Sequence, residues 1–381
     1  MKVTGDWLTS DSTQAVFAAL QADGNSALAV GGCVRNALMG VPVTDVDIAT
    51  DATPDMVQAL AHDAGLKSVP TGIEHGTITV VSGGTGYEVT TFRADMETDG
   101  RHAVVRFSTD MAEDAARRDF TMNALYANAT GRVIDPLGGL PDLEARRVRF
   151  IGNAHDRIAE DYLRILRFFR FAAWYGDPDH GFDPDALAAI ADSLDGLAGL
   201  SRERIGAEMI KLLSAPDPAP AIATMAQTGV LQAVLPESVP QGIGPLVHLE
   251  QSVGARPDAI RRLASLSVSD GTGLRLSKKD QRRLAQYQSL ISTSEHPPEL
   301  GYRHGADIAR DILLLRAALL EMPLDPVAIE TVRTAAKARC PVKPGDLMPD
   351  YSGAALGEKL REVEDRWIAS GFALRKDDLL R

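Results

Sequence analysis

Residues Ala27 to Thr50 read Ala-Leu-Ala-Val-Gly-Gly-Cys-Val-Arg-Asn-Ala-Leu-Met-Gly-Val-Pro-Val-Thr-Asp-Val-Asp-Ile-Ala-Thr. This pattern predicts a strand, a glycine turn, a short helix, and a second strand that carries Asp45 and Asp47. Side chains two residues apart on a strand share a face, so both carboxylates point out while Val46 and Ile48 point into the core. Two carboxylates so close repel each other unless a cation lies between them. We therefore expect Asp45 and Asp47 to be catalytic and to bind Mg²⁺, a hard ion that prefers oxygen ligands.

The glycine turn between these strands has the features of a phosphate site. Gly31 and Gly32 let the backbone approach a ligand closely. The helix that begins near Cys33 aims unpaired N–H groups and its positive dipole end at the same place, and Arg35 is a nearby countercharge. No Gly-Lys-Ser/Thr follows, so the turn is not a P-loop. We expect it to hold a nucleotide triphosphate.

A hairpin and a polar loop follow along the chain. Two alternating runs, 76–82 and 87–92, predict a β-hairpin beside the strand of the two aspartates. Glu88 on its second strand is a candidate third metal ligand, and a solvent-facing residue is the alternative interpretation. Polar residues from 93 to 107 predict a mobile loop beside the site. The candidate loop residues are Arg93, Asp95, Asp99 and Arg101.

The stretch 117–125 predicts a helix that carries polar side chains on one face. Asp119 and Asn123 lie one helical turn apart, and a carboxylate next to an amide suits the two hydroxyls of a ribose. The guanidinium of Arg118 suits a triphosphate. An amphipathic helix with a charged start is the simpler alternative.

A second helix pattern, 160–171, carries candidate residues for base recognition. Asp161 and Arg164 are three residues apart, and Glu160 can steady Arg164. An acceptor beside a donor fits cytosine and adenine and opposes uracil and guanine, with roughly 1 to 3 kcal/mol of discrimination for a good bidentate pair. Arg167 is a further candidate nucleotide-binding residue. The alternative interpretation is a surface ion pair, which contributes little to stability.

Composition limits the classes of function. The chain has 381 residues, 45% of them hydrophobic, and a net charge of −12, which argues against a protein that coats nucleic acid indiscriminately. No apolar run is long enough to span a bilayer, and the start lacks a signal-peptide pattern. The two cysteines, Cys33 and Cys340, predict neither a disulfide framework nor a zinc site. We expect a cytoplasmic protein whose partners include neither a membrane nor DNA.

Taken in order, four motifs resemble those of the bacterial class II tRNA nucleotidyltransferases, the CCA-adding enzymes of the poly(A) polymerase family. The resemblance covers about the first 240 residues well and is looser beyond them. One departure is Asn36, where the family pattern usually has Asp. The motifs are Gly31-Gly32-x-Val34-Arg35, Asp45-x-Asp47, Arg117-Arg118-Asp119-Phe120-Thr121-x-Asn123-Ala124 and Glu160-Asp161-x-x-Arg164.

The resemblance implies an α+β fold, in which a mixed-sheet head like a polymerase-β palm precedes an all-helical neck, body and tail. The implied domains are the head at 1–150, the neck with the nucleotide-selecting helix at 151–200, the RNA-binding body at 201–296 and the tRNA-binding tail at 297–381. The implied reaction is template-independent addition of C, C and A to the tRNA 3′ end from CTP and ATP. Asp45 and Asp47 would hold Mg²⁺, and pyrophosphate would be released.

Three alternatives stay open at this point. A CC-adding enzyme would be expected to lack the full loop at 93–102, and a bacterial poly(A) polymerase shares the head motifs. A non-catalytic RNA-binding protein should have lost carboxylates at the metal site, whereas Asp45 and Asp47 are both present. The oligomeric state is also open.

Overall fold

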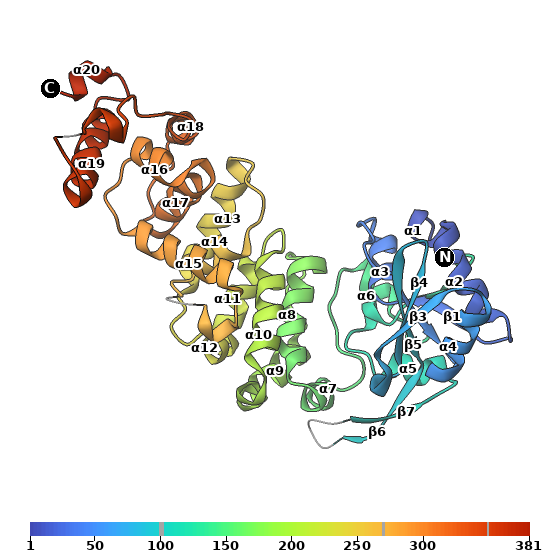
Figure 1. Cartoon of the computed structure of the whole chain (residues 1–381). Helices are drawn as coiled ribbons and strands as arrows, with labels where there is room; N and C mark the ends of the chain where they lie inside the picture. Colours follow the sequence, from blue (N-terminus) through green and yellow to red (C-terminus); the bar gives the residue numbers. More distant parts are fainter. Residues whose placement is uncertain (99–102, 269–270, 349) are drawn as a thin grey trace. The chain divides into compact units, whose positions relative to one another are not determined.

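The protein is described from a computed structural model that covers residues 1–98, 103–268, 271–348 and 350–381 (Figure 1). The chain forms two compact units. Unit 1 comprises Met1–Leu212 and Thr224–Val234, and unit 2 comprises Leu213–Ala223 and Leu235–Arg381. The predicted four-domain division stays a prediction. No helix in the described ranges is long and apolar enough to cross a membrane.

Unit 1 is built on a seven-stranded mixed sheet in the order β3-β4-β5-β2-β1-β8-β9. The pair β2–β5 is parallel, and the other pairs are antiparallel. This arrangement confirms the expected mixed-sheet α+β fold. The strands are β1 (Ala27–Val30), β2 (Asp47–Thr50), β3 (Lys67–Gly72), β4 (Thr77–Ser82), β5 (Thr85–Thr91), β8 (Tyr126–Ala127) and β9 (Val133–Ile134).

The expected hairpin is confirmed as β4 and β5. Burial alternates along β4, as it does in a strand with one face on the core. Gly83 and Gly84 both have positive φ, so the tight turn between the strands requires residues without a Cβ. Parallel pairing of β2 with β5 places Asp47 level with Glu88. The strand order therefore brings together the carboxylates of Asp47 and Glu88, which lie far apart in the sequence.

Short helices cover this sheet, and α2 and α4 both pack against β4. Thr53 caps α4, and Pro54 is its first residue, because proline fits the first turn, where its missing N–H leaves no bond unmade. The α-helices are α1 (Asp6–Thr9), α2 (Asp11–Gln21), α3 (Gly32–Met39), α4 (Pro54–Asp63), α5 (Met111–Ala116) and α6 (Leu140–Glu144); the 3₁₀ helices are η1 (Ile73–His75) and η2 (Thr121–Asn123).

The predicted loop at 93–107 is largely wrong. Two antiparallel strands, β6 (Arg93–Thr98) and β7 (Ala103–Phe107), form a separate ribbon. Asp95 pairs through its backbone with Val105. The ribbon is anchored at its base, where Arg93 Nη1 donates to the His75 carbonyl at 2.9 Å. The remaining candidates of this loop, Asp99 and Arg101, lie outside the described residues.

The helical part of unit 1 packs on the head segment through aromatic rings. Phe120 of the head lies 4.8 Å from the ring of Phe171 and 5.1 Å from that of Phe150, and Phe150 stacks on Phe168 at 5.7 Å. Phe168 and Phe171 belong to α8. The helices of this part are α7 (Ala154–Glu160), α8 (Leu163–Tyr175), α9 (Pro184–Asp192), η3 (Leu194–Gly199) and α12 (Val230–Val234), together with α10 (Arg202–Leu213) and α11 (Ala219–Gln227), each of which also has residues assigned to unit 2.

The regular secondary structure in the described residues of unit 2 is all helical, and the unit contains a buried ionic cluster. Arg261 donates to Glu250 at 2.8 Å and to Asp311 at 2.7 Å, and all three side chains are almost fully buried. Ser277 caps α15 by accepting from the Asp280 N–H. The helices are η4 (Pro240–Gly242), α13 (Ile243–Ser252), α14 (Ala259–Ser265), η5 (Thr272–Leu274), α15 (Lys278–Ile291), α16 (Pro297–His304), α17 (Ala306–Leu319), α18 (Pro326–Ala335), η6 (Pro344–Asp346), α19 (Gly353–Ala369) and α20 (Lys376–Leu379).

Candidate active site

Two exposed aspartates lie where β2 begins. Asp47 is the first residue of β2, and Asp45 stands just before it in an extended segment, where its carboxylate accepts from the Thr44 hydroxyl at 2.9 Å. Ile48 is fully buried, as expected, but Val46 is only half-buried because the strand does not extend that far. The two carboxylates therefore face solvent together without a regular strand beneath Asp45.

The carboxylate of Asp47 lies in an unfavourable electrostatic environment. Partial burial raises its pKa, the neighbouring carboxylates of Glu88 and Asp45 raise it further, and Arg118 opposes them. Within the described ranges, no group of three or more His, Cys, Asp or Glu side chains has the geometry to hold a metal ion. The candidate ligands are thus the pair Asp45 and Asp47, and a role for Glu88 stays a prediction.

The glycine turn leaves the start of α3 open, as expected. Gly31 has a φ of 69°, and no side chain caps the helix. A Cβ at Gly31 would lie 3.6 Å from Nη1 of Arg118, and a Cβ at Gly32 would lie 3.6 Å from Nη2 of Arg35. The N–H groups in the first turn of α3 and two guanidinium groups are therefore near one another, which is an arrangement that attracts phosphate.

Arg118 is held by a carboxylate that the sequence analysis did not single out. Its Nη2 donates to Asp114 Oδ2 at 2.9 Å, and the Tyr126 hydroxyl donates to the same oxygen at 2.8 Å. Burial works against ionisation of Asp114, but the charge and hydrogen bonds of Arg118 and Tyr126 bring its pKa below its ordinary value. The signal in the sequence that could have found this pair is its spacing, because Asp114 stands four residues before Arg118, as in a helical ion pair.

The expected helix over 117–125 is wrong. Only Thr121–Asn123 forms a single 3₁₀ turn, because Phe120 makes an isolated β-bridge with Phe150. Asn123 still reaches Asp119, with Nδ2 donating to Oδ1 at 3.2 Å.

Asp119 is buried and fully engaged. Its Oδ2 accepts two hydrogen bonds from Arg167, of which that from Nε measures 2.8 Å, and its Oδ1 also accepts from the Phe120 N–H at 3.0 Å. Burial opposes ionisation, yet the charge and hydrogen bonds of Arg167 and Asn123 lower the pKa of Asp119. Asp119 and Arg167 are thus brought together as partners of each other.

Arg35 is 5% exposed and is surrounded by neutral acceptors. Its Nη1 donates to Asn123 Oδ1 at 2.6 Å, and its Nη2 donates to Asn36 Oδ1 at 2.9 Å and to the Tyr175 hydroxyl at 2.8 Å. The guanidinium carbon also lies 3.9 Å from the centre of the Tyr175 ring. Burial lowers the pKa of Arg35. Asn36 therefore provides a neutral acceptor where a carboxylate would form an ion pair.

The predicted single helix over 160–171 is interrupted. α7 ends at Glu160, Asp161 is extended, and α8 begins at Leu163, whose N–H donates to Asp161 Oδ1 at 3.1 Å. The other oxygen of Asp161 accepts from Arg204 of α10 at 2.7 Å. Glu160 steadies Arg164 as expected, through a 2.6 Å ion pair. Asp161 and Arg164 therefore each have partners in this structure, and both stand at the start of α8.

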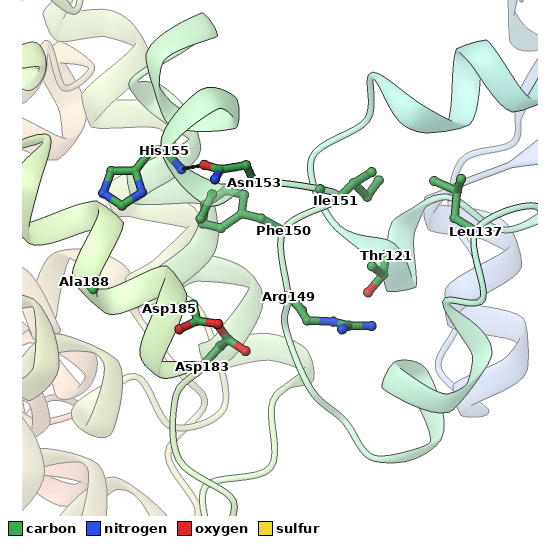
Figure 2. Close-up of a pocket in the computed structure, with 12 residues that line it drawn as sticks. Thr121, Leu137, Arg149, Phe150, Ile151, Asn153, His155, Asp183, Asp185 and Ala188 are labelled. Carbon is green, nitrogen blue, oxygen red and sulfur yellow. Dashed lines mark hydrogen bonds between the residues drawn. The ribbon is translucent and has the colours of Figure 1, made fainter.

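A separate cavity of about 630 Å³ lies between residues 149–153 and the start of α9 (Figure 2). Two of its polar side chains already have partners: His155 pairs with Asp192 at 3.1 Å, and Arg149 pairs with Asp142 at 2.8 Å. None of the candidate residues lines it. The aspartate pair and the glycine turn, rather than this cavity, form the candidate active site.

Comparison with known proteins identifies two regions of the chain and several relatives. Residues 27–149 match a family model described as the poly A polymerase head domain, and residues 181–240 match one described as a probable RNA and SrmB-binding site of polymerase A. The mitochondrial CCA tRNA nucleotidyltransferase 1 of Mus musculus is 35% identical over 92% of this chain and 84% of its own length. The CCA-adding enzyme of Geobacillus thermodenitrificans is 34% identical over 91% and 88%.

A solved structure shows the same architecture. The crystal structure of Bacillus stearothermophilus CCA-adding enzyme in complex with CTP aligns with a TM-score of 0.70 and 29% identity, over 94% of this chain and 93% of that one. The similarity therefore extends through both units and is not confined to the head.

Proposed function

The chain belongs to the family of CCA-adding tRNA nucleotidyltransferases, and we propose that it performs their reaction at the aspartate pair and glycine turn. It adds C, C and A to the 3′ end of tRNA without a nucleic-acid template, using CTP and ATP. The 3′-hydroxyl gives up its proton to solvent and its oxygen bonds to the α-phosphorus. The bond from the α-phosphorus to the oxygen it shares with the β-phosphate breaks, and pyrophosphate leaves with that oxygen. The observation that carries the proposal is the pair Asp45 and Asp47, exposed beside Arg118 and the open start of α3.

Mg²⁺ fits the donor set. Asp45 and Asp47 offer only carboxylate oxygens, and the raised pKa of Asp47 indicates that its negative charge is not balanced by the protein alone. When bound there, Mg²⁺ would neutralise phosphate charge and lower the pKa of the attacking hydroxyl. Glu88, level with Asp47 on the neighbouring strand, is the proposed third contributor of negative charge.

The remaining candidate residues divide by what they touch. Gly31, Gly32 and Arg118 bind the triphosphate, because N–H groups and a guanidinium converge there. Asp161 and Arg164 select the base from the start of α8, and Glu160 steadies Arg164. Arg35, Asp119, Asn123 and Arg167 support this site through the contacts they make with one another. The cytoplasmic location stays a prediction.

The test is extension of a tRNA that lacks its 3′ CCA, resolved to single nucleotides. CTP alone should add two residues, and ATP should then add one and stop, whereas UTP and GTP should add none. Two additions that ATP cannot extend would indicate a CC-adding enzyme, and a long ladder with ATP alone would indicate a poly(A) polymerase. Binding of tRNA without any addition would indicate a non-catalytic RNA-binding protein. Asp110→Asn, an exposed helix cap away from the pair, is a matched control for aspartate variants.

A further inference from the structure

One continuous chain of hydrogen bonds joins helix α8 to the head at two points, in addition to the direct hydrogen bond from Arg164 to the Arg117 carbonyl. The chain starts at Arg167 of α8 and passes through Asp119 and Asn123 to Arg35. It returns to α8 at Tyr175, whose hydroxyl accepts from Arg35 at 2.8 Å. These five residues, which we call the clamp, form a closed ring because both ends lie on the same helix.

The centre of the clamp is filled by one aromatic side chain. Phe171, 2% exposed, lies between the two ends of the clamp on α8. The guanidinium carbons of Arg35 and Arg167 lie 5.1 and 5.5 Å from its ring centre, and the Tyr175 ring lies 5.4 Å away. A closed polar ring around a buried aromatic side chain resists adjustment, because any shift of one member breaks a hydrogen bond or a ring contact.

The clamp lies on the same helix as Arg164, so a change in the clamp can shift the side chain proposed to select the base. Arg167 and Tyr175 are eight residues apart, which corresponds to about 12 Å along a helix. Arg164 lies three residues beyond Arg167 in the other direction, or about 4.5 Å. If the Tyr175 end were released, α8 could pivot about Arg167 against the hydrogen bond from Arg164 Nη2 to the Arg117 carbonyl, so that a shift of about 1 Å at Tyr175 would move Arg164 by at most about 0.4 Å. Hydrogen bonds to a base depend steeply on such displacements.

We propose that Tyr175 is a positioning residue for base selection: through Arg35 it fixes the angle of α8, and thereby the placement of Asp161 and Arg164 relative to the catalytic aspartates. This proposal rests on the proposed function. It gives Asp119, Asn123 and Arg167 a shared role, since each is part of the same connection. Tyr175 itself touches neither Asp161 nor the aspartate pair, so its effect is on geometry and not on chemistry.

The test compares Tyr175→Phe, which removes only the hydroxyl acceptor, with Tyr175→Ala, which also removes the stacked ring. Tyr87→Phe is the matched control, because the Tyr87 hydroxyl is likewise hydrogen-bonded, at 2.9 Å to Ser12, on the sheet face opposite Glu88. The readout is kcat and KM for each nucleotide on a tRNA that ends in the first C, with CTP against UTP.

We expect Tyr175→Phe to reduce the preference for CTP over UTP about fivefold while kcat for CTP changes less than about twofold, a loss near 1 kcal/mol of discrimination. Tyr175→Ala should reduce the preference further, and Tyr87→Phe should not change it. An equal loss of kcat/KM for both nucleotides, or unchanged preference in both Tyr175 variants, would overturn the proposal. Absence of nucleotide addition by the unmodified protein would instead refute the proposed function, so the two failures are distinguishable.

Discussion

Replacement of Asp114 by Asn should weaken both the fold of unit 1 and the binding of nucleotide. The Asp114 side chain is 2% exposed, and its Oδ2 accepts two hydrogen bonds from Arg118 and one from Tyr126. An amide at this position is neutral, so the Arg118 guanidinium loses its ion-pair partner. The structure therefore predicts a large effect from a change of one atom.

The magnitude follows from the burial of the pair. Breaking a buried ion pair by removing one partner costs about 3–5 kcal/mol. The Arg118 side chain is 22% exposed, so water compensates part of the loss, and we expect about 3 kcal/mol. For a unit of this size, that loss lowers the melting temperature by roughly 6–12 °C. Because Arg118 is also released from its position beside Gly31, the KM for CTP should rise about tenfold.

The pH dependence gives this prediction a definite sign. The pKa of Asp114 is lowered in the folded protein, so its contribution to stability is present above the unfolded pKa and is lost as the pH falls through the folded pKa. The difference in unfolding free energy between the unmodified protein and Asp114→Asn should therefore be constant near neutral pH and shrink as the pH falls below about 4.

Urea denaturation between pH 7 and pH 3, together with steady-state kinetics with CTP, measures these effects. Asp110→Asn is the control on the same helix, because asparagine caps helices as well as aspartate does, and its stability should change by less than about 0.5 kcal/mol. A variant at Asp114 that is as stable as the unmodified protein at pH 7, or whose deficit is the same at both ends of the pH range, would refute this reasoning.

Three further predictions concern the site itself. Asp47→Asn should lower nucleotide addition more than about 100-fold and leave tRNA binding intact, and full activity of this variant would refute metal binding by Asp47. Because the pKa of Asp47 is raised in the folded protein, the ionised carboxylate destabilises the fold as the pH rises. In metal-free buffer at pH 7 the variant should therefore melt at a higher temperature than the unmodified protein. Asp161→Ala should weaken selection against UTP and GTP by about tenfold in primer extension, and unchanged nucleotide choice would reduce Asp161 to a surface partner of Arg204. Glu88→Gln should raise the Mg²⁺ concentration for half-maximal activity about threefold or more, whereas an unchanged Mg²⁺ titration would exclude Glu88 from the site.

Some features were predictable because they depend on neighbours in the sequence. Alternating burial and a Gly-Gly turn are local properties, and the hairpin at β4 and β5 was predicted from them. The same holds for the glycine turn before α3 and for the two aspartates where β2 begins. The ion pair of Glu160 with Arg164 was predicted from their spacing of four residues. It forms even though Glu160 ends α7 and Arg164 lies in α8, because the break between the two helices is short.

The helix predicted over 117–125 was wrong, and the helix predicted over 160–171 is interrupted near its start, because long-range contacts outweigh the local pattern. In the stretch 117–125, Phe120 bridges to Phe150, and Asp119 turns toward Arg167. At Asp161, the side chain accepts from Leu163 and Arg204, which holds the backbone extended although the apolar period continues. The segment predicted as a loop forms a ribbon because pairing of its two strands satisfies their backbone N–H and C=O groups. The polar composition of the segment does not reveal this pairing.

The sequence by itself determined the fold class and which residues carry charge: an α+β head, a glycine turn, an aspartate pair and a set of arginines. Only the tertiary structure decided which of these residues meet. Arg35 and Tyr175 are 140 positions apart, Asp119 and Arg167 are 48 apart, and Asp161 and Arg204 are 43 apart. Spacing in the chain carries no information about such pairs, because they form only when packing of the apolar faces has already brought the elements together.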